Sequence, residues 1–227
     1  MDLSARHPAP SIDALLGLTS ELWPIIHDIS HVMKMRKEIK AVEELGYGQA
    51  AAALRGEATR RSEEIKKRLE EWKPIHGDGR DGANTPTTKR AIKTDLRIQS
   101  IVCNAEAYHH AAFVYFYRNI ESLPRRSPLV QYHAKEALAA CLRVVMFEGP
   151  MAALLWPLFV GACEAVKELD RSIARTVFQA TMDKQGFVNI AQSWDVVQEV
   201  WREGDEEARE VSWEEIGQAQ GLSLVFA

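Results

Sequence analysis

Two histidines one helical turn apart are the first residues of the chain with the spacing of a metal site. His27 and His31 bound the run His-Asp-Ile-Ser-His, which is close to the H-E-x-x-H signature of zinc proteases. If the segment is helical, the neighbouring isoleucines define an apolar face and both histidines lie on the opposite, polar side. The sequence suggests no third ligand nearby. The spacing therefore predicts solvated histidines, and we expect no metal site.

A second group of candidate residues combines histidines with aromatic rings and predicts a pocket between two helices. The candidate pocket residues are His109, His110, Phe113, Tyr115, Phe116, Tyr117, Trp156 and Phe159. Consecutive aromatic residues cover more than one helix face, so some of the rings must contact more than a single neighbouring helix. Tyrosine hydroxyls and a histidine could orient an apolar small molecule. The alternative is that the rings pack in the core around buried, hydrogen-bonded histidines.

The most apolar segment, Met151 to Val166, predicts a central buried helix. It is shorter than the ~20 residues that a membrane span needs, so we expect no membrane insertion. Pro157 lies inside it and predicts a kink with a freed carbonyl near Ala153. Glu164, near its end, is expected to form an ion pair with Arg171.

Helical periodicity extends over most of the chain, and very little of the sequence has the alternation of a strand. The predicted helices cover about residues 12–33, 37–72 (as one helix or two), 89–121, 127–147, 151–166, 170–186 and 189–201. Ser20, Asp170 and Asn189 are the predicted N-caps of three of them. Residues 73–88 are rich in Gly, Asp, Asn, Pro and Thr and predict a flexible loop. We expect an all-α, single-domain multi-helix bundle over residues 1–227, built around the central apolar helix.

Composition and motif content argue against several classes of function. The chain has 227 residues, 46% of them hydrophobic, and a net charge of −4, which argues against direct DNA binding. Cys103, Cys141 and Cys163 are too far apart to form a zinc cluster. The sequence contains no glycine-rich phosphate loop, nucleophile elbow or paired-carboxylate motif, so no cofactor and no catalytic residue is predicted. The N-terminus lacks a secretory signal, so we expect a nuclear or cytoplasmic protein.

The chain carries an ordered series of segments typical of one family, most of them in its second half. The most extended is Leu-Trp-Pro-Leu-Phe-Val-Gly-Ala-Cys-Glu-Ala at 155–165, and the others are 12–17, 115–118, 127–131, 170–171, 186–189 and 196–201, with Trp213 in the tail. This series resembles the C-terminal regulatory domain of fungal zinc binuclear cluster transcription factors. The resemblance implies an all-α fold, a regulatory role and protein partners of the transcription machinery. The six-cysteine DNA-binding cluster of that family has no counterpart in this sequence.

Three hypotheses for the function remain open. The first is a non-enzymatic regulatory domain of a fungal transcription regulator that senses a partner or a small apolar ligand. The second is a stand-alone small-molecule-binding protein, or an enzyme of the cyclase or isomerase type, in fungal secondary metabolism. Such chemistry could need only a shaped apolar pocket with a few hydrogen-bond donors. The third is a helical interaction module.

Overall fold

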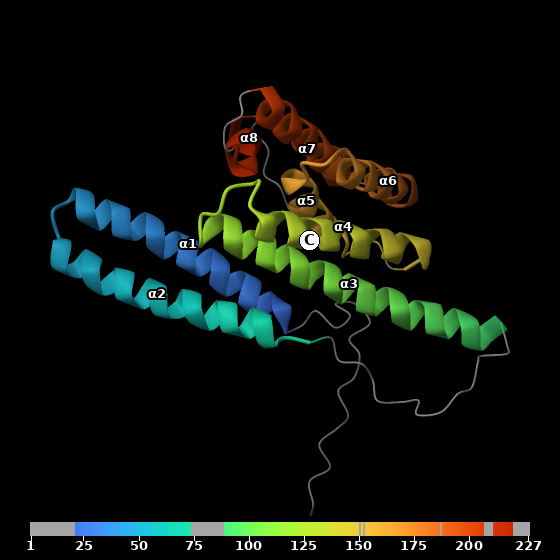
Figure 1. Ribbon diagram of the computed structural model, residues 1–227, viewed down its shortest axis with the longest axis horizontal. Helices are drawn as coiled ribbons and strands as arrows, with labels where there is room; N and C mark the ends of the chain where they lie inside the picture. Colours follow the sequence, from blue (N-terminus) through green and yellow to red (C-terminus); the bar gives the residue numbers. More distant parts are fainter. Residues whose placement is uncertain are drawn as a thin grey trace, which may run out of the picture.

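The computed structural model describes residues 21–73, 89–149, 151, 153–186, 188–206 and 211–219, and these residues form helices without strands. The helices are α1 (Leu22–Glu44), α2 (Gly48–Glu71), α3 (Lys89–Asn119), α4 (Pro128–Met146), α5 (Leu155–Glu164), α6 (Glu168–Gln185), α7 (Val188–Glu206) and α8 (Trp213–Ala219). They pack together around one hydrophobic core (Figure 1). The all-α fold predicted from the sequence is confirmed. The predicted loop at 73–88 and the predicted cap Ser20 lie almost entirely outside the described residues.

Helices α1 and α2 form a hairpin that lies along α3 (Figure 1). The turn between them needs a left-handed residue, and Gly46 supplies it with φ +83°. The backbone N–H of Gly46 donates to the carbonyl of Glu43 at 2.9 Å, and that of Tyr47 donates to Val42 at 3.1 Å, which closes the end of α1. The segment predicted as one helix or two is therefore divided at this turn, whereas Gly56 lies inside α2.

Helix α5 is the centre of the fold. All ten of its residues are buried, and it packs against α3, α4, α6 and α7, which confirms the predicted central apolar helix. Gly161 permits its close approach to α4, because a Cβ there would lie 3.3 Å from the carbonyl oxygen of Ala134. Among the described helices, none is both long enough and apolar enough to cross a membrane.

The predicted kink at Pro157 is wrong. Helix α5 begins at Leu155, so Pro157 lies in its first turn, where a backbone N–H has no intrahelical partner to lose. The proline therefore helps to start a short helix and does not bend a long one. The helix starts predicted at Asp170 and Asn189 are also wrong by a few residues, because α6 begins at Glu168 and α7 begins at Val188.

Buried polar side chains connect the two halves of the fold. The Arg118 guanidinium on α3 donates to Glu164 on α5 at 3.0 Å, and both side chains are largely buried. Arg171, the partner expected for Glu164, instead donates to Asp205 on α7 at 2.6 Å. Arg125, in the connection between α3 and α4, donates to the carbonyl of Ala165 at 2.8 Å. These bonds join α3 to α5, α6 to α7, and the α3–α4 connection to the end of α5.

Candidate functional site

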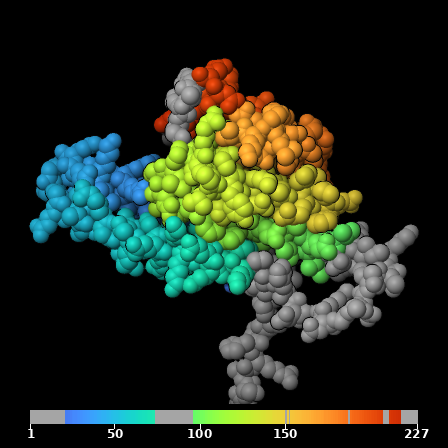
Figure 2. Space-filling view, viewed as in Figure 1, coloured from blue at the N-terminus to red at the C-terminus, as the bar shows by residue number. Residues whose placement is uncertain are grey.

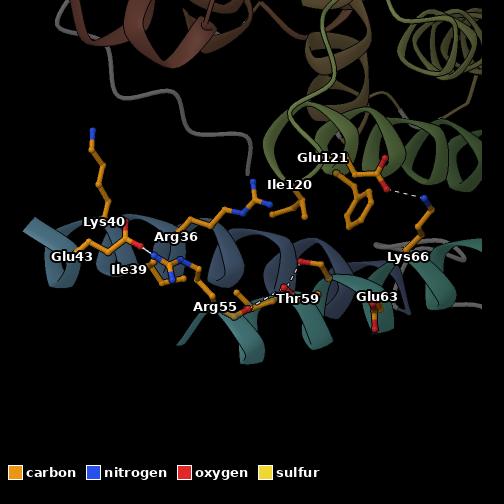
Figure 3. A pocket seen from close by; sticks show the side chains of 13 residues that line it. Arg36, Ile39, Lys40, Glu43, Arg55, Thr59, Glu63, Lys66, Ile120 and Glu121 are labelled. Carbon is orange, nitrogen blue, oxygen red and sulfur yellow. Dashed lines mark hydrogen bonds and ion pairs between the residues drawn. The ribbon is translucent and has the colours of Figure 1, made fainter. Parts of the chain in front are cut away.

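A groove opens where the α1–α2 hairpin extends past the end of α3. Helix α3 ends at Asn119, whose carbonyl oxygen accepts a hydrogen bond from Arg36 on α1 at 3.3 Å. From Arg36, α1 continues for about two turns to Glu44. This cavity of about 560 Å³, here called the hairpin groove, is shown in Figure 3. Its lining residues are Arg36, Ile39, Lys40, Glu43, Arg55, Ala58, Thr59, Ser62, Glu63, Lys66, Phe116, Ile120 and Glu121.

The floor of the hairpin groove is apolar. Ile39 of α1, Ala58 of α2, and Phe116 and Ile120 at the end of α3 each have less than a tenth of their surface exposed. The lining positions on α1 and α2 recur every three or four residues, so each helix presents one continuous face to the groove. The three helices therefore enclose an apolar strip that is open on one side.

The rim of the hairpin groove is charged. Seven of its thirteen lining side chains are ionic: Arg36, Lys40, Glu43, Arg55, Glu63, Lys66 and Glu121. Arg55 pairs with Glu43 across the hairpin. In Figure 3 the side chain of Lys40 extends away from α2 into open space. Small-molecule pockets are mostly lined by apolar side chains, so this mixture suits a polypeptide better than an apolar metabolite.

An ion pair closes one end of the groove. The Lys66 ammonium on α2 lies 2.7 Å from the Glu121 carboxylate, just after α3 (Figure 3). The hydrogen bond that Lys66 donates to Glu121 raises the pKa of Lys66, so this lysine stays charged at neutral pH. Lys66 also lies 5.9 Å from the centre of the Tyr117 ring. The pair connects α2 to the end of α3.

The residues predicted to form an aromatic pocket between α3 and α5 lie in several environments. Trp156 stacks on Tyr108 with ring centres 5.4 Å apart and meets Tyr115 edge-on at 6.2 Å. Phe159 contacts Trp213 of α8 at 5.2 Å. Phe116 alone among the eight candidates lines the hairpin groove. The rings of α3 and α5 thus contact one another directly beside Trp156.

His109 and His110 lie on the other side of α3 and have protein partners. His109 Nε2 lies 2.7 Å from the carbonyl oxygen of Leu69 near the end of α2. That oxygen can only accept, so Nε2 carries the proton. His110 Nδ1 lies 2.9 Å from Nδ1 of His133 on α4, so one ring donates and the other accepts. The Phe113 ring meets His109 edge-on at 5.0 Å and lies at a tilt to His133 at 4.3 Å.

Burial keeps the paired rings neutral. Desolvation lowers the pKa of His110 to about 4 and that of His133 to about 3. It also lowers the pKa of His109. His133 was not identified from the sequence, although it falls within the apolar stripe of α4. The histidine pair forms a partly buried hydrogen bond that joins α3 to α4.

His27 and His31 are exposed on α1, as predicted. Asp28, between them, accepts a hydrogen bond from Arg68 of α2 at 2.6 Å and so belongs to the hairpin interface. Within the described parts of the chain, no three His, Cys, Asp or Glu side chains are grouped so that they could hold a metal ion.

Comparison with known protein families gives a match over nearly the whole chain. The sequence model of the family described as "Fungal specific transcription factor domain" matches residues 2–227. No curated protein and no solved structure matches the chain significantly.

Proposed function

The chain belongs to the family of fungal specific transcription factor domains and so has a regulatory role in transcription, and we propose that it acts through a protein segment that docks in the hairpin groove. The observation that carries this proposal is the apolar strip between two charged helix faces. An amphipathic helix binds in such a groove with its apolar face down and its polar flanks against the rim.

Charge supports a protein partner over nucleic acid. The net charge of the chain is −4, and the groove's rim carries both signs, so it lacks the basic stripe of a phosphate-binding surface. The proposal therefore includes no direct DNA contact by this chain. Because the family regulates transcription, we expect the protein to act in the nucleus.

The test fills the groove without disturbing the core. Thr59 is exposed, lines the groove and bonds only its own helix, donating to the carbonyl of Arg55 at 3.0 Å. Thr176 on α6 is a matched control, because it is also exposed and donates to the carbonyl of Ser172 at 3.0 Å. Host strains carrying the wild type, a deletion, Thr59→Trp or Thr176→Trp are compared by RNA sequencing.

Transcripts that change on deletion should change in the same direction in the Thr59→Trp strain. Because the tryptophan fills part of the groove, the apparent affinity of the chain for its partner should fall about tenfold. The Thr176→Trp strain should match the wild type. A wild-type transcript profile in the Thr59→Trp strain, with protein levels unchanged, would exclude the groove.

A second candidate function is binding of a small, mainly apolar molecule at the aromatic residues between α3 and α5. Two buried polar atoms favour it, since Trp23 Nε1 and Asn104 Oδ1 have no hydrogen-bond partner among the described residues. The Trp23 ring contacts Tyr108, which stacks on Trp156. A guest that carries a hydrogen-bond acceptor would satisfy Trp23 Nε1. Native mass spectrometry of protein from its own host tests this function, which predicts a retained small molecule.

A further inference from the structure

We propose that the occupant of the hairpin groove is the hairpin tip of a second copy of this chain. The two hairpins pack antiparallel about a two-fold axis, and each tip completes the other's groove. This inference rests on the proposed function in one respect only, the use of the groove as a docking site.

The tip of the hairpin carries apolar side chains with no described neighbours to bury them. Leu45 is 72% exposed and Tyr47 is 65% exposed, on either side of the turn at Gly46. The hairpin projects from the rest of the molecule (Figure 2). Single exposed apolar residues are ordinary, but a leucine and a tyrosine at the end of a projection are accessible to another molecule.

Charge along α1 changes sign toward this tip. The middle of the helix is mainly basic, because Glu38 is its one acidic residue among Lys34, Arg36, Lys37 and Lys40. Its last turn is acidic, with Glu43, which pairs with Arg55 of the same chain, and Glu44. All seven of these side chains on α1 are exposed. In a two-fold pair, the basic stretch of one copy lies against the acidic end of the other, and the same contact is made twice. The surface is therefore complementary to itself.

The length of the projection fits the same arrangement. From Arg36 to Glu44, where the helix ends, α1 rises about 12 Å at 1.5 Å per residue. A two-fold axis midway between Lys40 and Glu43 therefore brings Glu44 of one copy, just before its tip, to the level of Ile39 of the other. At that level the groove floor is apolar, with Ile39 and Phe116 below the rim. The tip of one chain thus meets the floor of the next.

A charge-reversal pair tests this self-association without assuming a precise register. The variant Arg36→Glu/Lys40→Glu makes the exposed face of α1 acidic at both ends, and Glu43→Lys/Glu44→Lys makes it basic at both ends. Sedimentation velocity of the full chain measures the dissociation constant of each variant alone and of their mixture. Circular dichroism checks that each keeps the helix content of the wild type.

The wild type should form a dimer, and each variant alone should have a dissociation constant raised at least about tenfold. The equimolar mixture should dimerise again, because opposite charges then face each other. Leu45→Asp should also weaken the wild-type dimer about tenfold, whereas Leu169→Asp, at a residue 69% exposed on α6, should leave it within about twofold. Either a wild type that stays monomeric or a mixture that does not associate overturns the proposal.

These outcomes are separable from those of the proposed function. A monomeric wild type combined with a transcriptional effect of Thr59→Trp would mean that the groove binds a different protein. A dimer that forms while Thr59→Trp leaves transcription unchanged would mean that the two chains associate as proposed but that regulation does not use the groove.

Discussion

Helix α5 and the projecting half of the α1–α2 hairpin differ in how many neighbours surround them. Helix α5 contacts α3, α4, α6 and α7, and every one of its side chains is buried. The projecting half of the hairpin packs mainly on itself, and the side chains around its turn are exposed. The burial of α5 stabilises the fold, while the exposed end of the hairpin is accessible to another protein chain.

This contrast predicts opposite consequences for mutations in the two regions. A truncated side chain at α5 leaves a void inside the core, because its neighbours are held from several sides. A truncated side chain at the hairpin tip only exchanges one solvated group for another. Core mutations should therefore change the free energy of unfolding, and tip mutations should change association.

The largest expected effect is at Trp156, which lies between the rings of Tyr108 and Tyr115 and is 8% exposed. Trp156→Ala should lower the free energy of unfolding by about 3–5 kcal/mol, because it removes the ring that Tyr108 and Tyr115 both contact and leaves a cavity. Urea denaturation followed by circular dichroism measures this loss. A midpoint close to that of the wild type would mean that α5 is less tightly enclosed than its burial indicates.

An intermediate effect is expected from acid, through the buried His110–His133 pair. Their pKa values in the folded protein, about 4 and about 3, lie below the ordinary value of 6.5. The unfolded chain therefore binds more protons below pH 6.5, and stability falls as the pH falls toward 4. Between pH 7 and pH 5 we expect a loss of roughly 2 kcal/mol from each of the two rings.

The matched variants for this prediction are His110→Asn/His133→Asn and His27→Asn. The first removes both buried rings, so the fall in stability between pH 7 and pH 5 should become shallower relative to its own value at pH 7. The second removes an exposed ring and should keep the slope of the wild type. Equal slopes in all three proteins would assign the acid sensitivity to other groups.

The smallest effect on stability is expected at the hairpin tip. Leu45→Ala and Tyr47→Ala should change the free energy of unfolding of the monomer by no more than about 0.5 kcal/mol, since both side chains are mostly exposed. Denaturation at low protein concentration measures this change. A loss of 2 kcal/mol or more, which is the scale of a buried site, would show that the tip is already covered within one chain.

Much of the fold could be predicted from the sequence. The apolar run that contains Trp156 identified the central helix, and Ser127 before Pro128 marked the start of α4, because a proline in the first turn loses no hydrogen bond. The start of α5 was predicted too early, and Pro157 was therefore placed mid-helix. Periodicity alone does not show where an apolar run stops being irregular and becomes helical.

The candidate site was much less predictable. Of the eight residues singled out, only Phe116 lines the hairpin groove, and the other lining residues look like an ordinary charged helix surface in the sequence. The partner of Glu164 was also misplaced, because Arg118 is distant in sequence and reaches it only through the packing of α3 on α5. Such pairs depend on contacts between elements, which local patterns do not specify.

The sequence by itself determined the all-α fold, the buried central helix, the exposed histidines of α1 and the family resemblance. These follow from local preferences and from the 3.6-residue period of apolar side chains, which each segment carries on its own. Tertiary structure alone decided that α3 ends while the hairpin continues, which creates the groove. It also decided that His110 meets His133, since both depend on where separate helices lie side by side in space.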